Sequence, residues 1–455
     1  MNFDTIILDS DSYKYSQFLQ YPKNTTNVFS YIEARGYSWG VDKHVFFGLQ
    51  AFIKQYLLTP ITQEDIDFAE EIITAHGEPF NREGWQYILD TYNGKLPVVI
   101  RAVPEGTVLK THNVLVTIEA TDPKCFWLTS FLETALLRAI WYPTTVATNS
   151  YVSKQIILNF LEKTGDPSSI DFKLHDFGAR GVSSKESAGL GGMGHLLNFL
   201  GTDTVTALLY ARKFYNADMA GFSIPAMEHS TVTSWGRENE VESYRNMLRT
   251  FGREGTILAC VSDSYDIYNA CELWGTVLKD EVIKSGATVV VRPDSGVPEE
   301  VVLKCVEILG KNFGYTKNSK GYNVLNNVRV IQGDGINQET IRKILENLVK
   351  HGWSADNVAF GQGGALLQQV NRDTLKFAMK CSAALIDGTW VDVYKDPITD
   401  QGKKSKKGRL DLFKDEDGNF FSGREDWMPS QLRTVYKNGE LLIDENWETI
   451  KARVK

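Results

Sequence analysis

The chain has 455 residues, 42% of them hydrophobic and 23% charged, with a formal net charge of −8 at pH 7. The length allows a substantial core and two domains, and the acidic balance argues against a nucleic-acid or anionic-membrane partner, since either requires a basic face. Residues 1–18 lack the pattern of a signal peptide and no apolar run approaches the roughly 18 to 20 residues that span a bilayer, so we expect a soluble, cytoplasmic protein.

The first part of the chain is predicted to be rich in strands. The segment NTTNVFSYIEARG (24–36) has the composition of a strand, and residues 96–120 contain several strands joined by Pro-Glu-Gly and Thr-His-Asn turns. Over residues 125–140, apolar side chains recur at helical spacings, which indicates a helix.

From about residue 170, short apolar strands alternate with helical patterns. The predicted strands are 171–177, 256–263, 288–294, 328–334 and 357–363. This alternation predicts a parallel α/β sheet closed into a barrel. We assign the barrel to residues 166–385, and a second, β-rich α+β domain to residues 1–165, completed by residues 386–455.

The strand in TVVVRPDSG (288–296) ends with a cation and a carboxylate. Arg292 and Asp294 are two residues apart, so they project from the same side of an extended backbone. Other predicted strands also end in polar, aromatic or glycine residues: Asp176, Phe177, Arg180, Asp203, His229, Asp263, Asp334 and the GQGG segment 361–364. Since ligands bind at the carboxyl ends of barrel strands, we interpret these residues as one site.

Each of these residues has an ordinary structural explanation when it is taken alone. A lone Asp after a strand is usually a helix N-cap, and a lone His such as His229 is more often structural than catalytic. The QGDG segment is more often a turn than a phosphate cradle, and the basic run KKSKKGR (403–409) is more often a solvated loop. The site hypothesis therefore depends on the whole set, because consecutive strands all end in charge or glycine.

The residue types at these ends indicate a phosphorylated ligand. Glycine turns let backbone N–H groups approach phosphate oxygens, and arginines hold phosphate or carbonyl groups. The seven histidines and five scattered cysteines form no zinc spacing, and the cysteines suit reduced thiols. Converging aspartates instead fit Mg²⁺, which prefers oxygen ligands and its own waters. A phosphorylated sugar or nucleotide bound with magnesium is the predicted ligand.

Ten motifs identify a family that this sequence resembles. They are DSYK (11–14), LPVVIRAVPEG (96–106), WYPTTVATNS (141–150), KLHDFGARGVSS (173–184), GTDTV (201–205), EHST (228–231), VSDSYDIYNAC (261–271), RPDSG (292–296), VIQGDG (330–335) and KKGRL (406–410). The chain resembles the nicotinamide phosphoribosyltransferases, type II phosphoribosyltransferases with an irregular α/β barrel. The resemblance implies a homodimer with shared active sites that joins nicotinamide to 5-phosphoribosyl 1-pyrophosphate (PRPP), giving nicotinamide mononucleotide and pyrophosphate in NAD salvage.

The resemblance implies a role for each residue of the nicotinamide site. Phe177 and the partner subunit's Tyr13 would sandwich the pyridine ring, a stacking contact that adds about 0.5–1.5 kcal/mol beyond area burial. Asp203 would accept a hydrogen bond from the carboxamide NH₂, and Arg292 would donate to the carboxamide carbonyl.

The resemblance also implies the phosphate, metal and catalytic residues. Asp263, Asp294 and Asp334 would handle the ribose hydroxyls, Mg²⁺ and its waters, with Asp294 facing the carbon that is attacked. His229 would be phosphorylated by ATP, a co-substrate, and is catalytic with Asp263 and Asp294. The remaining phosphate ligands would be Arg180, Gly333, Gly363, Gly364, Lys395, Lys403 and, from the partner subunit, Arg35, Arg372 and Lys380.

Four positions depart from vertebrate members of the family. Ala179 replaces Tyr, Met227 replaces Ala, Ala259 replaces Ser and Gln362 replaces Ser, which leaves the tolerance for inhibitors and for larger pyridines such as the riboside open.

Three alternative functions are weighed against nicotinamide phosphoribosyl transfer. The nearest is nicotinate phosphoribosyltransferase, which Asp203 disfavours because its carboxylate would repel nicotinate. The second is a barrel that binds a nucleotide or phosphosugar as a sensor without turning it over. The third is a different barrel enzyme that acts on a phosphosugar without any pyridine base.

Overall fold

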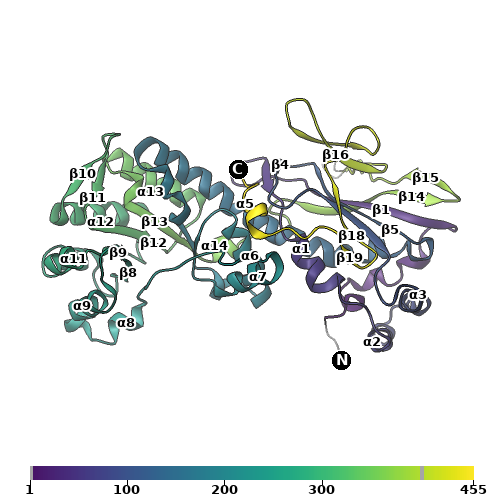
Figure 1. Cartoon of the computed structure of the whole chain (residues 1–455), viewed down its shortest axis with the longest axis horizontal. Helices are drawn as coiled ribbons and strands as arrows, with labels where there is room; N and C mark the ends of the chain where they lie inside the picture. Colours follow the sequence, from purple (N-terminus) through teal and green to yellow (C-terminus); the bar gives the residue numbers. More distant parts are fainter. Residues whose placement is uncertain (1–3, 400–403) are drawn as a thin grey trace. The chain divides into compact units, whose positions relative to one another are not determined.

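The computed structural model describes residues 4–399 and 404–455, and the chain forms two compact units (Figure 1). Unit 1 comprises Met1–Thr148, Ala211–Ala217 and Asn371–Lys455, and unit 2 comprises Asn149–Tyr210 and Asp218–Val370. The boundaries therefore lie after residues 148 and 370, whereas the sequence assignment put them after 165 and 385.

An antiparallel sheet of seven strands forms the centre of unit 1. Its order is β15-β14-β1-β5-β3-β18-β19. These strands are β1 (Thr25–Ala34), β3 (Val98–Ala102), β5 (Val114–Ala120), β14 (Phe377–Ile386), β15 (Thr389–Asp392), β18 (Arg433–Lys437) and β19 (Glu440–Leu441). β1, β3 and β5 confirm the strands expected near the start of the chain. β14 pairs with β1 from Thr25 opposite Ile386 to Ala34 opposite Phe377, which is why residues 371–385 belong to unit 1 and not to the barrel.

Helices pack against this sheet around an aromatic core. The helices are α1 (Leu49–Phe52), α2 (Gln63–His76), α3 (Arg82–Tyr92), α4 (Leu128–Phe131), α15 (Trp447–Lys451) and the part of α5 (Glu133–Thr164) up to Thr148, after which that helix belongs to unit 2. Two short strand pairs complete the unit, β2 (Lys43–Val45) with β4 (Val108–Lys110), and β16 (Leu410–Lys414) with β17 (Phe420–Arg424). Trp85 and Trp127 meet edge to face with ring centroids 4.8 Å apart, and both join the core. α4 and α5 confirm the helix expected over 125–140.

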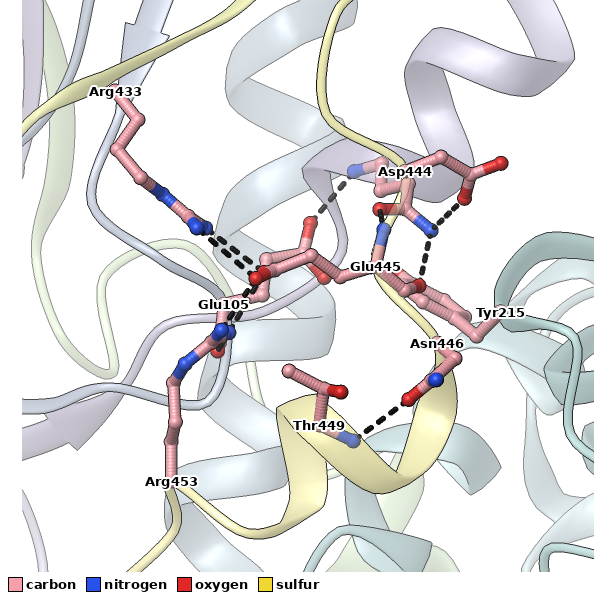
Figure 2. Close-up of polar contacts among 9 residues, drawn as sticks. Glu105, Tyr215, Arg433, Asp444, Glu445, Asn446, Thr449 and Arg453 are labelled. Atoms are coloured by element: carbon pink, nitrogen blue, oxygen red, sulfur yellow. Dashed lines mark hydrogen bonds and ion pairs between the residues drawn. The ribbon is translucent and has the colours of Figure 1, made fainter.

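A carboxylate with two arginine partners fixes the C-terminal helix to the sheet. Arg433 on β18 and Arg453 beyond α15 both donate to the Glu445 carboxylate, Arg433 Nη2 at 2.8 Å and Arg453 Nη1 at 2.7 Å (Figure 2). Partial burial raises the pKa of Glu445, but the hydrogen bonds from both arginines outweigh it and lower this pKa to about 2.

A second buried carboxylate binds the short segment Ala211–Ala217 into unit 1. Glu105 accepts from the Tyr215 hydroxyl at 2.8 Å and from the Gln50 N–H at 2.6 Å (Tyr215 and Glu105 are drawn in Figure 2). The Gln50 side chain also donates to the Phe214 carbonyl at 2.9 Å. These buried bonds explain why a segment inside the barrel sequence belongs to the other unit.

Unit 2 is a barrel of parallel strands. The sheet order is β7-β6-β13-β12-β9-β8. These strands are β6 (Leu174–Asp176), β7 (Gly201–Thr202), β8 (Ile257–Val261), β9 (Thr288–Arg292), β12 (Val328–Gln332) and β13 (Val358–Gln362). Five of the six lie within the predicted strands, and β7 (Gly201–Thr202) was not predicted.

An irregular segment joins the two edges of this sheet. Phe222 forms a parallel bridge with Gly201 of β7, and Ala226 forms one with Ala259 of β8. Pro225 lies within the segment and has no N–H to donate, so a regular ladder cannot form there. The barrel is closed but irregular at this place, which confirms the predicted fold class.

Helices follow most of the barrel strands. They are α6 (Lys185–Leu196), α7 (Val205–Tyr215), α8 (His229–Thr233), α9 (Glu240–Phe251), α10 (Ile267–Gly275), α11 (Lys279–Ser285), α12 (Pro298–Phe313), α13 (Gln338–Lys350) and α14 (Gly364–Leu367). A hairpin of β10 (Tyr315–Lys317) and β11 (Asn323–Leu325) follows α12. Val302, Cys305 and Leu309 on α12 are fully buried, so one apolar face of this helix packs into the core of the unit. Figure 1 shows α12 and α13 side by side next to β12.

Two general features agree with the composition. The five cysteines are all free, and four of them are buried. In the described parts of the chain, no helix is long and apolar enough to cross a bilayer.

A buried histidine makes the stability of unit 1 dependent on pH. His44 on β2 is fully buried, both its ring nitrogens lack a hydrogen-bond partner, and burial lowers its pKa from 6.5 to about 3. Since the unfolded chain takes up a proton near pH 6.5 and the folded chain does not, the free energy of unfolding falls as the pH drops from 6.5 toward 3.

We predict that His44→Phe removes this contribution. Measured by urea unfolding, the free energy of unfolding of the parent should fall by about 2.5 kcal/mol more between pH 7 and pH 4.5 than that of the variant, from about 1.4 kcal/mol for each pH unit below the unfolded pKa. His76→Gln, at an exposed position of α2, is the control and should follow the parent. Parallel pH profiles for the parent and His44→Phe would refute this prediction.

Candidate active site

An aromatic ring at the end of β6 is the platform of the site. Phe177 directly follows the strand, and its ring lies against the backbone of Gly361 on the neighbouring strand β13. A Cβ at Gly361 would lie 1.9 Å from Phe177 Cε2, so only glycine leaves room for the ring. Gly333, after β12, lies under the same ring edge, where a Cβ would be 3.5 Å from Cε2. These glycines allow a flat side chain to lie across the ends of three strands.

The cation and carboxylate after β9 lie next to this platform. Arg292 Nη2 is 3.9 Å from Asp294 Oδ2, and Arg292 Nε is buried without a hydrogen-bond partner. Asp294 Oδ1 faces Gly333, 3.3 Å from where a Cβ would stand. Partial burial raises the pKa of Asp294; Arg292 opposes this, while the charges of Asp263 and Asp334 add to it. Asp294 is therefore a partly buried carboxylate between opposing charges, since His229 also acts to lower its pKa.

A histidine and a carboxylate are hydrogen-bonded at the end of β8. His229 Nε2 lies 2.9 Å from Asp263 Oδ1, and Ser295 Oγ donates to Asp263 Oδ2 at 2.6 Å. The side chain of His229 is 46% exposed and that of Asp263 only 5%, so the imidazole extends into solvent while the carboxylate that holds it is buried. Because Nε2 faces the carboxylate, Nδ1 is the ring nitrogen left for a reaction with a ligand.

Asp203 follows β7, the strand beside β6. Its N–H donates to the Asp176 carbonyl at 2.9 Å, and its Oδ1 accepts from Ser223 Oγ at 2.7 Å. His175 on β6 lies near enough for the Asp203 charge to oppose the lowering of the histidine pKa by burial. Asp203 remains an exposed carboxylate beside the strand that carries Phe177.

The two glycines and the arginine predicted for phosphate lie close together. Gly363 and Gly364 begin α14, and no atom would stand within 4 Å of a Cβ at Gly364. The turn that contains Arg180 (Ala179–Gly181) lies against them, with a Cβ at Gly181 3.6 Å from the Gly364 Cα. Arg180 itself is exposed. The open backbone of Gly363 and Gly364 and the cation of Arg180 therefore lie close together on one side of the Phe177 ring.

A cavity of about 670 Å³ fills the barrel on the amino-terminal side of these residues. Several side chains that line this cavity come two residues before a site residue on the same strand, because residues i and i+2 of a strand share a face. They include His175 before Phe177, Val290 before Arg292 and Ile331 before Gly333. Ala259, one of the departures from the vertebrate family members, also lines this cavity.

The other predicted phosphate ligands belong to unit 1. Lys380 on β14 borders a cavity of about 380 Å³. Burial lowers its pKa, Glu133 opposes this, and the charges of Arg35, Lys395 and Lys14 lower it further. Such a group of cations is suited to an anion.

Three further residues of unit 1 were predicted to bind ligand. Arg372 is exposed beside Asp373, with Nη2 3.1 Å from Oδ1, and Tyr13 is 55% exposed. Lys403 lies outside the described residues, although the adjoining Lys404 pairs with Asp396 at 3.0 Å.

The carboxylates fit magnesium only in a partly hydrated form. Within residues 4–399 and 404–455, no group of three His, Cys, Asp or Glu side chains is placed to hold a metal ion. Both oxygens of Asp263 have partners, whereas Asp294 is partly buried near the like charges of Asp263 and Asp334. Mg²⁺ usually takes one or two carboxylates and keeps several waters, and Asp294 with Asp334 match that requirement.

Four residues of the site were missed by the sequence analysis. Gly361 was identified only as part of the GQGG segment, whose glycines were interpreted as a phosphate-binding turn. His175, Ser223 and Ser295 were not assigned a role. His175 was detectable, because it precedes Phe177 by two residues and so shares its face. The serine contacts were not, because each joins segments that are distant in the sequence.

Comparison with known proteins defines the class of enzyme. Residues 172–440 match the model of the nicotinate phosphoribosyltransferase (NAPRTase) family, and residues 5–100 match the nicotinamide phosphoribosyltransferase N-terminal domain. The barrel with its charged strand ends is therefore that of a phosphoribosyltransferase, an enzyme that transfers a pentosyl group. The chain belongs to the nicotinate phosphoribosyltransferase family.

Curated relatives cover nearly the whole chain. A nicotinamide phosphoribosyltransferase of Xanthomonas campestris pv. campestris is 57% identical over 99% of this chain and 98% of its own length. A nicotinamide phosphoribosyltransferase of Acinetobacter baylyi is 31% identical over 98% of this chain and 96% of its own length.

Solved structures support the same fold. The nicotinate-nucleotide pyrophosphorylase of Pyrococcus furiosus has a TM-score of 0.66 at 16% identity, covering 100% of this chain and 96% of that one. The human nicotinic acid phosphoribosyltransferase has a TM-score of 0.60 at 16% identity, covering 98% of this chain and 93% of that one.

The contact between Phe177 and Gly361 can be tested without any ligand. We predict that Gly361→Ala lowers the free energy of unfolding by about 1–3 kcal/mol, because the added methyl group overlaps the ring. In a Phe177→Ala background the same change should cost less than about 1 kcal/mol, since the ring is gone. Denaturant unfolding of the four proteins measures this coupling, and equal costs in both backgrounds would show that the ring does not lie on Gly361.

Proposed function

We propose that this enzyme transfers the phosphoribosyl group of PRPP to nicotinamide, giving nicotinamide mononucleotide and pyrophosphate in NAD salvage in the cytoplasm. The observation that carries the proposal is the position of Phe177. It follows β6, which pairs with β7, the strand before the Asp203 carboxylate. On the other side its ring reaches Gly333 after β12, which also faces Asp294, two residues beyond Arg292 at the end of β9. A flat heterocycle with a carboxamide matches this set of partners. The relatives from Xanthomonas campestris and Acinetobacter baylyi are nicotinamide phosphoribosyltransferases, which supports the same substrate.

Asp203 favours the amide over the acid. A carboxamide NH₂ donates a hydrogen bond to a carboxylate, whereas the carboxylate of nicotinate would be repelled by roughly a few kcal/mol at an effective dielectric near 20. Ser223 already donates to one oxygen of Asp203, which leaves the other oxygen to accept from the ligand. Nicotinate is therefore the weaker candidate.

In the proposed reaction the protein acts by position and charge. Phe177 stacks on the pyridine ring, Arg292 donates to the carbonyl, and Asp203 accepts from the NH₂. The bond from ribose C1 to pyrophosphate breaks, its electron pair leaves with pyrophosphate, and the pyridine nitrogen forms the new bond to C1. Asp294, with no covalent role, stabilises the positive charge that develops on the ribose. Bound magnesium would supply charge that neutralises pyrophosphate.

We also propose that ATP phosphorylates His229. The Asp263 carboxylate holds Nε2, so Nδ1 is the atom that would accept the phosphoryl group. Asp263 then stabilises the charge on the phosphorylated ring. Hydrolysis of the phosphohistidine is coupled to phosphoribosyl transfer.

A homodimer with shared sites is part of the proposal. Unit 1 holds cations that suit a diphosphate, namely Arg35, Arg372, Lys380 and Lys395, and an exposed ring at Tyr13. In the proposed dimer, the partner subunit's Tyr13 stacks on the free face of the nicotinamide ring. The partner's Arg35, Arg372, Lys380 and Lys395 bind the phosphates together with Arg180 and Lys403, since Lys395 lies close enough to Lys380 in unit 1 to lower its pKa.

Asp203→Asn tests which base the enzyme prefers. The parent, given PRPP, Mg²⁺ and ATP, should form the mononucleotide from nicotinamide and little from nicotinate. The variant should lose about ten- to hundredfold in kcat/KM for nicotinamide, as expected for a hydrogen bond to a charged group, and should gain relative use of nicotinate. An unchanged ratio of the two kcat/KM values would contradict the role of Asp203, and no mononucleotide from either base would refute the proposed function.

His229→Ala tests the ATP step. We expect the parent to take up phosphate from γ-labelled ATP in an acid-labile form, and the variant to lose labelling and at least about a hundredfold of ATP hydrolysis. His351→Ala, at an exposed histidine of the same unit, is the control and should label normally. ATP hydrolysis by His229→Ala at the parent's rate would remove His229 from the mechanism.

A further inference from the structure

Tyr13 is an exposed ring on an anchored turn. It lies in the 3-10 turn Ser12–Lys14 with 55% of its surface exposed, whereas Lys14 is 6% exposed and Tyr15 is 4% exposed. The Lys14 ammonium lies 5.3 Å from the centre of the Tyr13 ring. The residues that follow Tyr13 are fixed in the protein while its ring faces outward.

Polar contacts fasten the preceding residues to helix α5. Arg138 Nη2 donates to both carboxylate oxygens of Asp9 at 2.6 Å. Thr134 and Asp11 bond reciprocally: the Asp11 N–H donates to Thr134 Oγ1 at 3.2 Å, and this hydroxyl donates to Asp11 Oδ2 at 2.7 Å. We call residues 9–14 the strap.

Two further contacts complete the attachment. Lys14 forms an ion pair with Glu133, and the ring of Tyr15 meets Phe131 edge to face at 5.2 Å. Thr134 and Arg138 are four residues apart and so share one face of α5, and Glu133 precedes Thr134 at the start of the helix. The first turns of α5 therefore hold the strap on both sides of Tyr13.

The strap also borders the cationic cavity of unit 1. Lys14 and Glu133 line the cavity of about 380 Å³ that Lys380 lines. Glu133 attracts Lys380, and its charge opposes the lowering of the Lys380 pKa by burial. One surface thus presents an aromatic ring and a phosphate-binding cation at a fixed spacing.

We propose that the strap and its helix face are a positioning device that sets Tyr13 for stacking on the pyridine ring bound by the partner subunit, with Thr134 as its central positioning residue. The inference rests on the proposed function, in which Tyr13 supplies that stacking contact. Without the Thr134 hydroxyl, the turn keeps its sequence and its exposed ring but loses two bonds to Asp11, one to its backbone N–H and one to its carboxylate. The consequence should be weaker nicotinamide binding and not slower bond formation.

Thr134→Val removes the hydroxyl with little change of shape. We expect KM for nicotinamide to rise about three- to tenfold, with kcat and KM for PRPP within about twofold of the parent. Amide hydrogen exchange at residues 11–15 should become faster. Thr134→Ser restores the hydroxyl and should recover both values. Thr145→Val is the matched control on the same helix, because the Thr145 hydroxyl donates to the Trp141 carbonyl of its own helix and not to the strap.

Tyr13→Ala separates failure of this inference from failure of the proposed role of Tyr13. If Tyr13→Ala raises KM for nicotinamide but Thr134→Val leaves KM and exchange unchanged, the positioning role is refuted. If Tyr13→Ala itself leaves KM unchanged, the proposed stacking and the inference both fail. Should Thr134→Val unfold, Lys14→Met replaces it: faster exchange at residues 11–15 with a raised KM supports the device, and unchanged values refute it.

Discussion

The contact of the Phe177 ring with the backbone of Gly361 is the constraint on which the site depends. A side chain at residue 361 would occupy the ring's place, since a Cβ there would stand 1.9 Å from Cε2. Gly361 pairs with His175 in the parallel register of β13 and β6. Phe177 follows His175 by two residues and projects from the same face, so its ring lies across the end of β13. The ring's position in turn determines which neighbouring strand ends, those of β7, β12 and β9, meet a ligand that lies on it.

The charged side chains around this ring suit the binding of a charged ligand, but they lower the stability of the folded protein when no ligand is bound. Asp294 is partly buried near Asp263 and Asp334, and its pKa is raised above the usual range. Arg292 keeps a buried Nε without an acceptor, which costs free energy in the absence of ligand. Groups of this kind are typical of sites that bind charged substrates, because the ligand supplies the missing partners. In the proposed reaction, the ribose on which positive charge develops and the departing diphosphate supply both signs of charge.

Much of the barrel and its site could be predicted from the sequence, because strand patterns and the residues that follow them are local. Phe177, Arg292, Asp294 and Gly333 do lie together after their strands. What the pattern could not give is non-local: the pairing of β14 with β1, which moves residues 371–385 into unit 1, and the bridges of Phe222 and Ala226 that close the barrel. Pro225 gives that closing segment no strand signature.

A crystal structure with nicotinamide bound tests the central claim most directly. We expect the pyridine ring to be offset-stacked on Phe177, with ring centroids about 4.5–7 Å apart, the carboxamide nitrogen hydrogen-bonded to Asp203 and the carbonyl oxygen to Arg292. Nicotinamide bound away from Phe177, or stacked there with its carboxamide contacting neither Asp203 nor Arg292, would contradict it.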